Sequence, residues 1–205
     1  MNGRRDLGAA AWRERLAAED VTGDLADRLA EYLVLLGRFG SAVDLVSAAD
    51  AEQVVRRHIV RSLVAVRHLP SEGRLVDIGS GNGFPAVPLL LAMPGLEGTL
   101  LEPRERRWAF LSEVSRSLGL RAEVLREDVR QHRGSGYAAM TVRAVHPRVW
   151  QGERERLLAE GGVLVWWAGV RSRGVAAGWG GGCVVTSPGL ARESAEFVVW
   201  RRCST

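Results

Sequence analysis

Hydrophobic residues recur at helical spacing in the first 70 residues of the chain. Between residues 25 and 36, leucines return every three or four positions, which gives a predicted helix one apolar face. A second helix is predicted to start at Asp50, where Asp50 and Gln53 resemble a capping box, and to end at Pro70. Residues 1–70 are therefore predicted to form a helical extension that packs on the rest of the chain.

From residue 71 the pattern changes to short apolar runs that alternate with amphipathic stretches. Alternating strands and helices favour right-handed βαβ crossovers and a parallel sheet. Residues 71–205 are thus predicted to form an α/β, Rossmann-like core whose sheet is mostly parallel, with an antiparallel hairpin at its C-terminal end. The predicted strands are 75–78, 99–101, 122–125, 140–142, 163–167, 183–186 and 196–200, and the predicted helices are 84–93, 105–118 and 148–159.

Composition narrows the class of protein. The 205 residues fit one domain with a short extension, and 46% hydrophobic and 25% charged residues are typical of a soluble globular chain. The longest apolar run, 84–96, is interrupted by three prolines and is too short to span a bilayer. The N-terminus lacks the apolar core of a secretory signal, and Cys183 and Cys203 form no metal-type pair. We therefore expect a cytoplasmic monomer with no membrane span and no metal site.

All 28 basic residues are arginine, and the net charge is +4. Arginine grips phosphate bidentately, but it cannot serve as a tunable amine base, so chemistry that needs a lysine is excluded. Clusters of arginines at 104–107 and 126–133 are compatible with nucleic-acid contacts, although such clusters are more often a solvated helix face. The charge pattern by itself gives only a weak nucleic-acid footprint.

The most informative motif is the glycine-rich turn that follows the first core strand, Gly79-Ser80-Gly81-Asn82-Gly83, with Asp77 just ahead of it. Ligands of doubly wound sheets bind at the carboxyl ends of strands, and glycines let the backbone approach a ligand closely. The spacing G-x-G-x-G is one residue tighter than the dinucleotide fingerprint, which seats a pyrophosphate. The tighter loop suits a ligand without phosphates, such as S-adenosylmethionine.

Glu102 forms the second element of the predicted site. It ends the second core strand about twenty residues after the loop, where an acid accepts hydrogen bonds from ribose hydroxyls. The alternative is a solvated acid at a strand end. Its coupling to the glycine loop favours the cofactor role.

A set of short segments extends the glycine motif on both sides: Asp77 to Pro85 with Pro88-Leu89, Arg106-Arg107, Phe110-Leu111, Leu118-Gly119-Leu120, Arg143-Ala144, Asp44-Leu45, Arg57-His58-Ile59 and Ser62-Leu63. In these segments the chain resembles the bacterial methyltransferase family called GidB or RsmG, whose members methylate N7 of a guanine in the 530 loop of 16S ribosomal RNA. The resemblance covers about residues 25–170 and implies a class I methyltransferase fold, S-adenosylmethionine as cofactor, and 16S ribosomal RNA or the small ribosomal subunit as partner.

The resemblance also implies roles for individual residues. Asp128 and Val129 would contact the adenine end of the cofactor, and Arg143 would reach both the cofactor and the target pocket as the candidate catalytic residue. A surface ion pair is the alternative for Arg143. The remaining predicted cofactor-binding residues are Gly79, Ser80, Gly81, Gly83, Phe84 and Glu102.

The implied reaction needs no general base. Guanine N7 has an exposed lone pair and no proton, so catalysis rests on proximity and alignment. We therefore assign no catalytic role to the histidines: His58 is interpreted as a packing or interface residue, and His146 as a loop residue that could line the pocket.

The departures from the family pattern concentrate on the substrate side. The family usually has Asn-Leu-Thr at Asp44-Leu45-Val46, Asp at Arg61, and Leu-Lys-Gly at Trp167-Ala168-Gly169. Arg171 or Arg173 could replace the missing lysine. Two other functions therefore stay open: a divergent methyltransferase acting on another RNA or a small molecule, and a non-catalytic relative that serves as a binding module.

Overall fold

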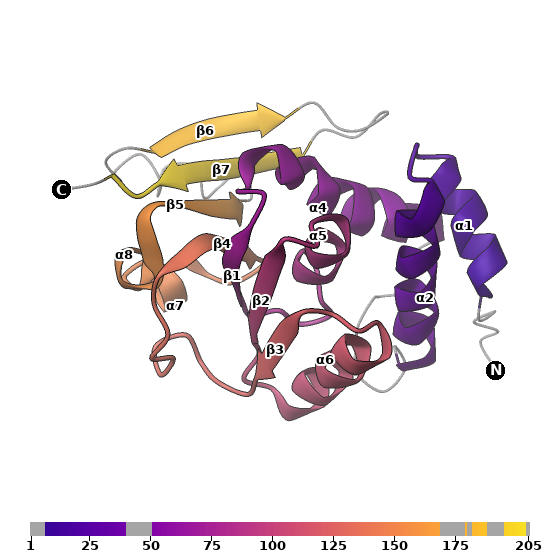
Figure 1. Cartoon of the computed structure of the whole chain (residues 1–205), viewed down its shortest axis with the longest axis horizontal. Helices are drawn as coiled ribbons and strands as arrows, with labels where there is room; N and C mark the ends of the chain where they lie inside the picture. Colours follow the sequence, from indigo (N-terminus) through magenta and orange to yellow (C-terminus); the bar gives the residue numbers. More distant parts are fainter. Residues whose placement is uncertain (1–6, 40–50, 169–178, 180–181, 188–194, 204–205) are drawn as a thin grey trace.

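The computed structural model describes residues 7–39, 51–168, 179, 182–187 and 195–203. Within them, seven strands form one sheet in the order β3-β2-β1-β4-β5-β7-β6 (Figure 1). Neighbouring strands among β3, β2, β1, β4 and β5 run parallel, whereas β7 pairs antiparallel with both β5 and β6. The predicted sheet and its C-terminal hairpin are confirmed. The strands are β1 Gly73–Ile78, β2 Leu96–Leu101, β3 Ala122–Leu125, β4 Tyr137–Arg143, β5 Leu158–Trp167, β6 Gly182–Ser187 and β7 Ala195–Arg201.

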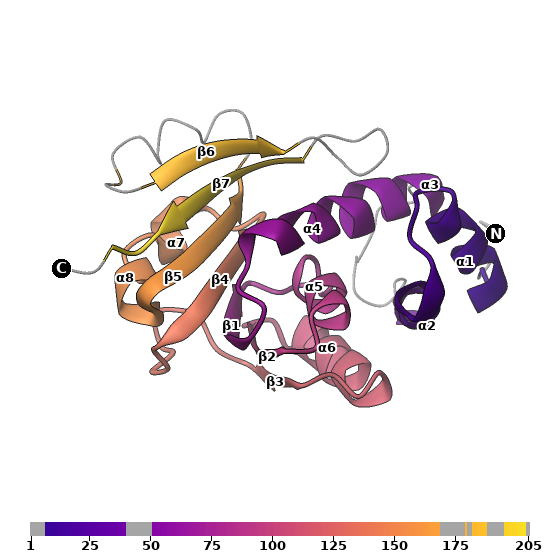
Figure 2. The same ribbon diagram turned by 45° about the horizontal axis from the view of Figure 1, so that its top comes forward.

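Helices cover both faces of the sheet (Figure 2). Helices α5 (Ala86–Ala92) and α6 (Glu105–Ser117) connect β1 to β2 and β2 to β3 on one side, as the βαβ pattern predicted. Helices α7 (Pro147–Trp150) and α8 (Arg154–Leu157) lie on the other side, between β4 and β5. The sheet is therefore shielded from water on both faces, which parallel strands require.

Helices also fill the described part of the N-terminal 70 residues. Helix α1 spans Ala9–Ala17 and α2 spans Gly23–Phe39. A long helical run then extends toward β1 (Figure 2). It consists of α3 (Ala51–Val54), the π-helical turn η1 (Val55–Val60), α4 (Arg61–Leu63) and the 3₁₀ turn η2 (Val64–His68). The proposed capping residue Asp50 lies outside the described residues.

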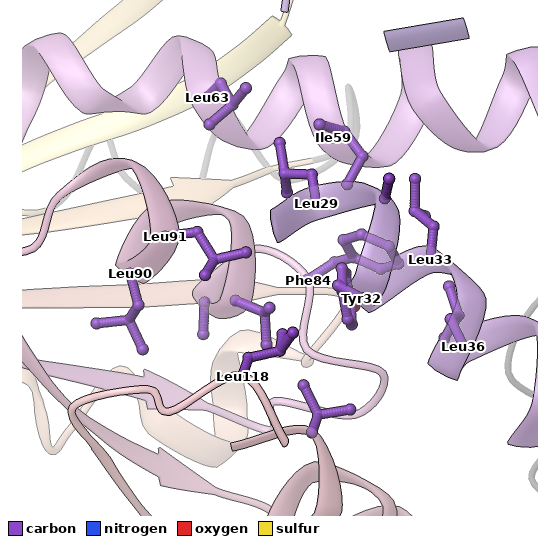
Figure 3. Packing of buried hydrophobic residues seen from close by; sticks show 14 of the residues in the cluster. Leu29, Tyr32, Leu33, Leu36, Ile59, Leu63, Phe84, Leu90, Leu91 and Leu118 are labelled. Carbon is purple, nitrogen blue, oxygen red and sulfur yellow. The ribbon is translucent and has the colours of Figure 1, made fainter. Parts of the chain in front are cut away.

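One apolar cluster joins these helices to α5 and α6. Leucines on one face of α2 point toward Ile59 and Leu63 of the helical run and toward the residues around α5 (Figure 3). A fully buried leucine contributes about 1.5–3 kcal/mol to folding, so this interface stabilises the N-terminal helices and the core together. The boundary between two domains at residue 70 stays a prediction.

The prediction of a single helix at 148–159 is wrong. Two short helices, α7 and α8, flank a turn at Gly152, and β5 starts at Leu158 rather than at Val163. Backbone hydrogen bonds explain the longer strand: Gly161 N donates to Arg202 O, and Arg202 N donates to Gly162 O. The apolar residues Trp150, Leu157 and Leu158 are all fully buried, but they belong to three elements rather than to one helix face.

Candidate functional site

A pocket of about 530 Å³ opens at the carboxyl ends of the parallel strands. Its walls come from the segments after β1, β2, β3 and β4, because the carboxyl ends of parallel strands meet at one edge of a sheet. The chain proceeds from β1 to β2 and β3 on one side and then returns to β4 and β5 on the other, so strand order reverses between β1 and β4. Ligands of doubly wound sheets bind at such a reversal.

The glycine loop forms the floor of the pocket. Gly79 and Gly81 line it and have positive φ angles of 67° and 54°, which L side chains rarely adopt. A Cβ on Gly79 would lie 2.5 Å from Cγ2 of Val145, so only glycine lets the segment after β4 approach. Ser80 lies between them and is buried, and its hydroxyl donates to the carbonyl of Asp77.

Gly83 is not among the residues that line the pocket, and its predicted contact with the cofactor stays a prediction. A Cβ there would lie 2.6 Å from Cγ2 of Val87 and 3.0 Å from the hydroxyl of Tyr32. Its φ angle is 89°. Gly83 thus allows the loop to pack against α5 and α2, and the sequence pattern could not distinguish this role from ligand contact.

Glu102 connects the end of β2 to the glycine loop. Its side chain is buried, and its two oxygens accept hydrogen bonds from Gly81 N and Arg104 N, each at 2.9 Å. Each carboxylate oxygen has two lone pairs, so both can accept a second hydrogen bond from a ligand. Glu102 lines the pocket and is therefore not a solvated acid at a strand end.

Arg143, at the end of β4, lies on the opposite wall. Its Nη2 donates to the carbonyl of Arg57 at 2.8 Å and to Nδ1 of His58 at 2.9 Å. These partners are not those of a surface ion pair. Burial lowers the pKa of Arg143 to about 10, with a further contribution from the charge of Arg61, so the side chain stays cationic at neutral pH.

His58 has a more specific environment than packing alone. Burial and the charge of Arg143 lower the pKa of His58 to about 4, so its ring is neutral at pH 7. A guanidinium has only donors, which requires Nδ1 to be the acceptor and leaves the proton on Nε2. His58 also lines the pocket and stacks on Phe84, with ring centroids 4.8 Å apart and planes at 24°. Sequence reasoning missed this link.

Phe84 joins the loop to the N-terminal helices (Figure 3). Its ring meets that of Tyr32 edge-on, with the ring centroids 5.4 Å apart. The buried Tyr32 hydroxyl donates to the carbonyl of Asn82 within the glycine loop. Two helices therefore fix the conformation of the loop. Tyr32 occupies an ordinary apolar position of an amphipathic helix, so the sequence carried no signal of this contact.

Asp77 lies beneath the loop and is 1% exposed. One carboxylate oxygen accepts from the Thr141 hydroxyl at 2.6 Å, and the other, Oδ2, has no hydrogen-bond partner within the described part of the chain. Burial raises the pKa of Asp77 to about 6, against the effect of the Thr141 bond. A carboxylate in this position costs stability when it is charged.

Asp128 and Val129 line the pocket from the segment after β3. Asp128 accepts from the backbone and the side chain of Arg130, and the side-chain bond holds the pKa of Asp128 below its usual range. Val129 is buried in the apolar cluster behind the wall. Arg104 and Arg107 also line the pocket, as does His146, whose Nδ1 accepts from Arg148 N.

Two of the positions that depart from the family pattern lie in the described part of the chain, next to β5. The carbonyl of Arg61 accepts a hydrogen bond from Trp167 Nε1 at 3.1 Å, which ties the helical run to the end of β5. Ala168 packs against the apolar cluster on the α7 side. Arg171 and Arg173 lie outside the described residues, as does the segment Asp44-Leu45-Val46.

The family model described as "rRNA small subunit methyltransferase G" (GidB) matches residues 26–173. The chain belongs to this family. The ribosomal RNA small subunit methyltransferase G of Stenotrophomonas maltophilia (strain K279a) is 35% identical over 170 residues, which cover 79% of this chain and 77% of that relative. That of Nitrosomonas europaea is 39% identical over 99 residues, covering 48% and 46%. The predicted family and the predicted class, an S-adenosylmethionine-dependent methyltransferase, are confirmed.

Solved structures with low sequence identity share the fold. The 16S rRNA N2 G1207 methyltransferase of T. thermophilus, in complex with AdoMet and guanosine, has a TM-score of 0.56 at 15% identity, over 69% of this chain and 42% of that one. The tRNA (m1A58) methyltransferase of Aquifex aeolicus has a TM-score of 0.57 at 16% identity, over 70% and 68%. These likenesses establish the class I methyltransferase fold.

None of the helices in the described ranges has the length and hydropathy needed to cross a membrane. Among those residues, no group of three or more His, Cys, Asp or Glu side chains is arranged to hold a metal ion.

Proposed function

We propose that the protein transfers a methyl group from S-adenosylmethionine to N7 of a guanine in the 530 loop of 16S ribosomal RNA. The observation that carries the proposal is the pocket at the strand-order reversal, in which Glu102 binds Gly81 N while Arg143 faces it from β4. Membership of the small-subunit methyltransferase G family supports the choice of substrate.

The residues around the pocket fit the parts of the cofactor. Gly79, Ser80 and Gly81 line the pocket, and a Cβ on Gly81 would meet no atom closer than 3.6 Å, so the bare backbone of Gly81 leaves room for the methionine part of the cofactor. Glu102 has free lone pairs for the ribose hydroxyls. Asp128 and Val129 offer a polar and an apolar surface for adenine, and Phe84 lines the same pocket.

When bound, the cofactor would supply an electrophilic methyl group on a sulfonium with a neutral thioether as its leaving group, and guanine N7 carries a lone pair and no proton, so no general base would be needed. The protein is then required to align the two partners rather than to move protons. Arg143 carries a positive charge, so it would not stabilise the cationic methylated base, because like charges repel. Its guanidinium is suited to an anionic group instead, either the carboxylate of the cofactor or a phosphate of the RNA.

The proposal extends to partner, oligomeric state and location. The partner is 16S ribosomal RNA within the small ribosomal subunit, and the protein acts as a monomer in the cytoplasm. Arg104 and Arg107 at the pocket supply cationic groups for the phosphates of an RNA loop, which position the strand while the base is read inside the pocket.

A methylation assay tests the proposal. Purified protein and labelled S-adenosylmethionine are incubated with small ribosomal subunits, and with free 16S RNA, from cells that lack the modification; the product nucleoside is identified by mass spectrometry. We expect one 7-methylguanosine in the 530 loop, and no transfer to subunits that already carry it. Cofactor binding in calorimetry with transfer only to another RNA would favour the divergent methyltransferase. No cofactor binding would leave the non-catalytic binding module.

A further inference from the structure

The segment between β3 and β4, residues 126–136, is held by a chain of side chains that the methyl transfer does not use. His132, 6% exposed, is at its centre. Its Nδ1 lies 3.1 Å from Oε2 of Glu127, and its Nε2 lies 2.8 Å from the hydroxyl of Tyr137. Tyr137 is the first residue of β4 and is fully buried, whereas Glu127 lines the pocket. These three side chains therefore link the pocket wall at Glu127 to the start of β4 at Tyr137.

Both ring nitrogens of His132 are satisfied. The Nδ1–H donates to the carboxylate of Glu127, and in the neutral ring Nε2 accepts from the hydroxyl of Tyr137; in a charged ring both nitrogens donate, and the Tyr137 oxygen accepts. An interior histidine with two satisfied nitrogens is held in one orientation, because leaving either partner unpaired would cost free energy.

Gly134 provides an independent sign that the backbone is built around this histidine. A Cβ at Gly134 would lie 2.3 Å from Nε2 of His132 and 2.6 Å from the hydroxyl of Tyr137. The backbone at Gly134 thus lies directly against the His132–Tyr137 hydrogen bond. Arg156 Nη1 then donates to the Gly134 carbonyl at 3.1 Å, which fixes the same stretch from α8.

His132 is also tied to the turn that carries the pocket residues. Its backbone N–H donates to the carbonyl of Asp128 at 3.2 Å. Val129 lies within this turn. A ring that is fixed by Glu127 on one side and Tyr137 on the other therefore fixes the turn in which Asp128 and Val129 face the pocket.

We propose that His132 is a positioning residue, which orders the Glu127–Asp128–Val129 wall for the adenosine end of the cofactor. The inference rests on the proposed function, since it takes this pocket to hold S-adenosylmethionine. A wall that is ordered before binding spares the ligand the entropic cost of ordering it, so the effect should fall on cofactor affinity. The methyl-transfer step, once cofactor is saturating, should not depend on His132.

The decisive comparison is between His132→Asn and His132→Leu, whose side chains have the same number and branching of heavy atoms. The asparagine amide can still donate to Glu127, and leucine cannot. We expect His132→Leu to raise the Kd for S-adenosylmethionine in calorimetry by about tenfold, as for the loss of one buried charge-assisted hydrogen bond. His132→Asn keeps a donor for Glu127 but loses the bond to Tyr137, so it should raise Kd by a smaller factor, about threefold, and both variants should keep kcat at saturating cofactor within about twofold.

Two further variants keep the test decisive if His132→Leu fails to fold. Tyr137→Phe removes only the hydroxyl that bonds Nε2, and Gly134→Ala places a methyl group against the same bond. Both should raise Kd and KM for the cofactor while kcat is retained. Gly152→Ala is the matched control, because a Cβ at Gly152 meets nothing within 4 Å; its Kd should not change.

The outcomes separate the inference from the proposed function. If the unmodified protein does not bind S-adenosylmethionine, the proposed function fails. If it does bind, and folded variants at His132, Tyr137 and Gly134 bind equally well, the positioning role is refuted. A fall in kcat at unchanged KM would refute it as well, because that result would place His132 in the chemical step.

Discussion

The two walls of the pocket are built in different ways. The wall at the ends of β1 and β2 is made by residues of one motif that are close together in sequence, such as Gly79 and Gly81. Glu102 accepts a hydrogen bond from Gly81 N and so ties the end of β2 to this motif. The opposite wall joins Arg143 at the end of β4 to His58 in the helical run, a pair separated by 85 positions. The first wall depends on positive-φ backbone, to which the N-terminal helices add contacts through Tyr32 and His58, whereas the second is itself built across the junction of those helices and the core.

This difference explains which residues the sequence revealed. A glycine with positive φ in a strand–loop–helix context leaves a recognisable pattern, because few other residues can replace it. A histidine that is neutral because it is buried beside arginines leaves none, since its role depends on partners brought from elsewhere in the chain. The following predictions test whether the two walls respond to substitution as differently as they are built.

The largest effect is expected at Gly81. Gly81→Val adds a branched side chain at a φ of 54° on the floor of the pocket, so we expect the affinity for S-adenosylmethionine to fall by about a thousandfold or more in calorimetry. Gly119→Val is the control, because Gly119 has a φ of 56° and a Cβ there meets nothing within 4 Å. The two variants share the same backbone strain. Equal cofactor affinity in both would show that Gly81 does not face the cofactor.

The next effect concerns stability, at Asp77. Its folded pKa of about 6 lies above the ordinary 3.8, so the contribution of Asp77 to stability is fully present below pH 3.8 and is lost as pH rises through 6. That difference corresponds to about 3 kcal/mol. We therefore expect the free energy of unfolding of Asp77→Asn, measured relative to the unmodified protein by urea denaturation, to be up to about 3 kcal/mol higher at pH 8 than at pH 4.

Thr141→Val serves as the companion to this experiment. It removes the hydroxyl that bonds Oδ1 of Asp77, so it should destabilise the protein at pH 8, where the carboxylate is charged. In the background of Asp77→Asn, the same substitution should cost less. If Asp77→Asn gives the same change in free energy at pH 4 and pH 8, the carboxyl group does not titrate in this range.

The fold was predictable from the sequence to a greater extent than the site. The alternation of apolar runs identified β1 to β5 and the helices α5 and α6, because each has its own periodicity. It failed at 148–159, where buried residues at helical spacing belong to α7, α8 and β5, and only backbone pairing across the sheet decides this. Pocket residues within the motif were predictable, whereas the contacts of Tyr32 and His132 arise from tertiary packing.

A smaller effect is expected at Glu102, which connects the motif wall to the ribose side. Glu102→Gln keeps an acceptor for one backbone N–H but loses the negative charge and places an amide against the other. Hydrogen bonds to a charged group contribute about 1.5–3 kcal/mol, so we expect the Kd for the cofactor to rise by about thirtyfold. Glu123→Gln, at an exposed position of β3, is the control. No difference between the two variants would remove Glu102 from the cofactor site.

The smallest effect is expected at His58, where two substitutions separate its two contacts. His58→Asn keeps an acceptor for Arg143 Nη2 but loses the stack on Phe84, whereas His58→Phe keeps the stack and loses the acceptor. If His58 acts by orienting Arg143, then His58→Phe should lower the rate of methyl transfer to ribosomal RNA at saturating cofactor by about fivefold, as for one lost hydrogen bond, and His58→Asn should retain most of it. Cofactor affinity should change little in His58→Phe, because that variant keeps the stack on Phe84 of the glycine motif. The opposite order of rates would mean that the second wall acts through the aromatic stack on the glycine loop, and that the two walls are not independent.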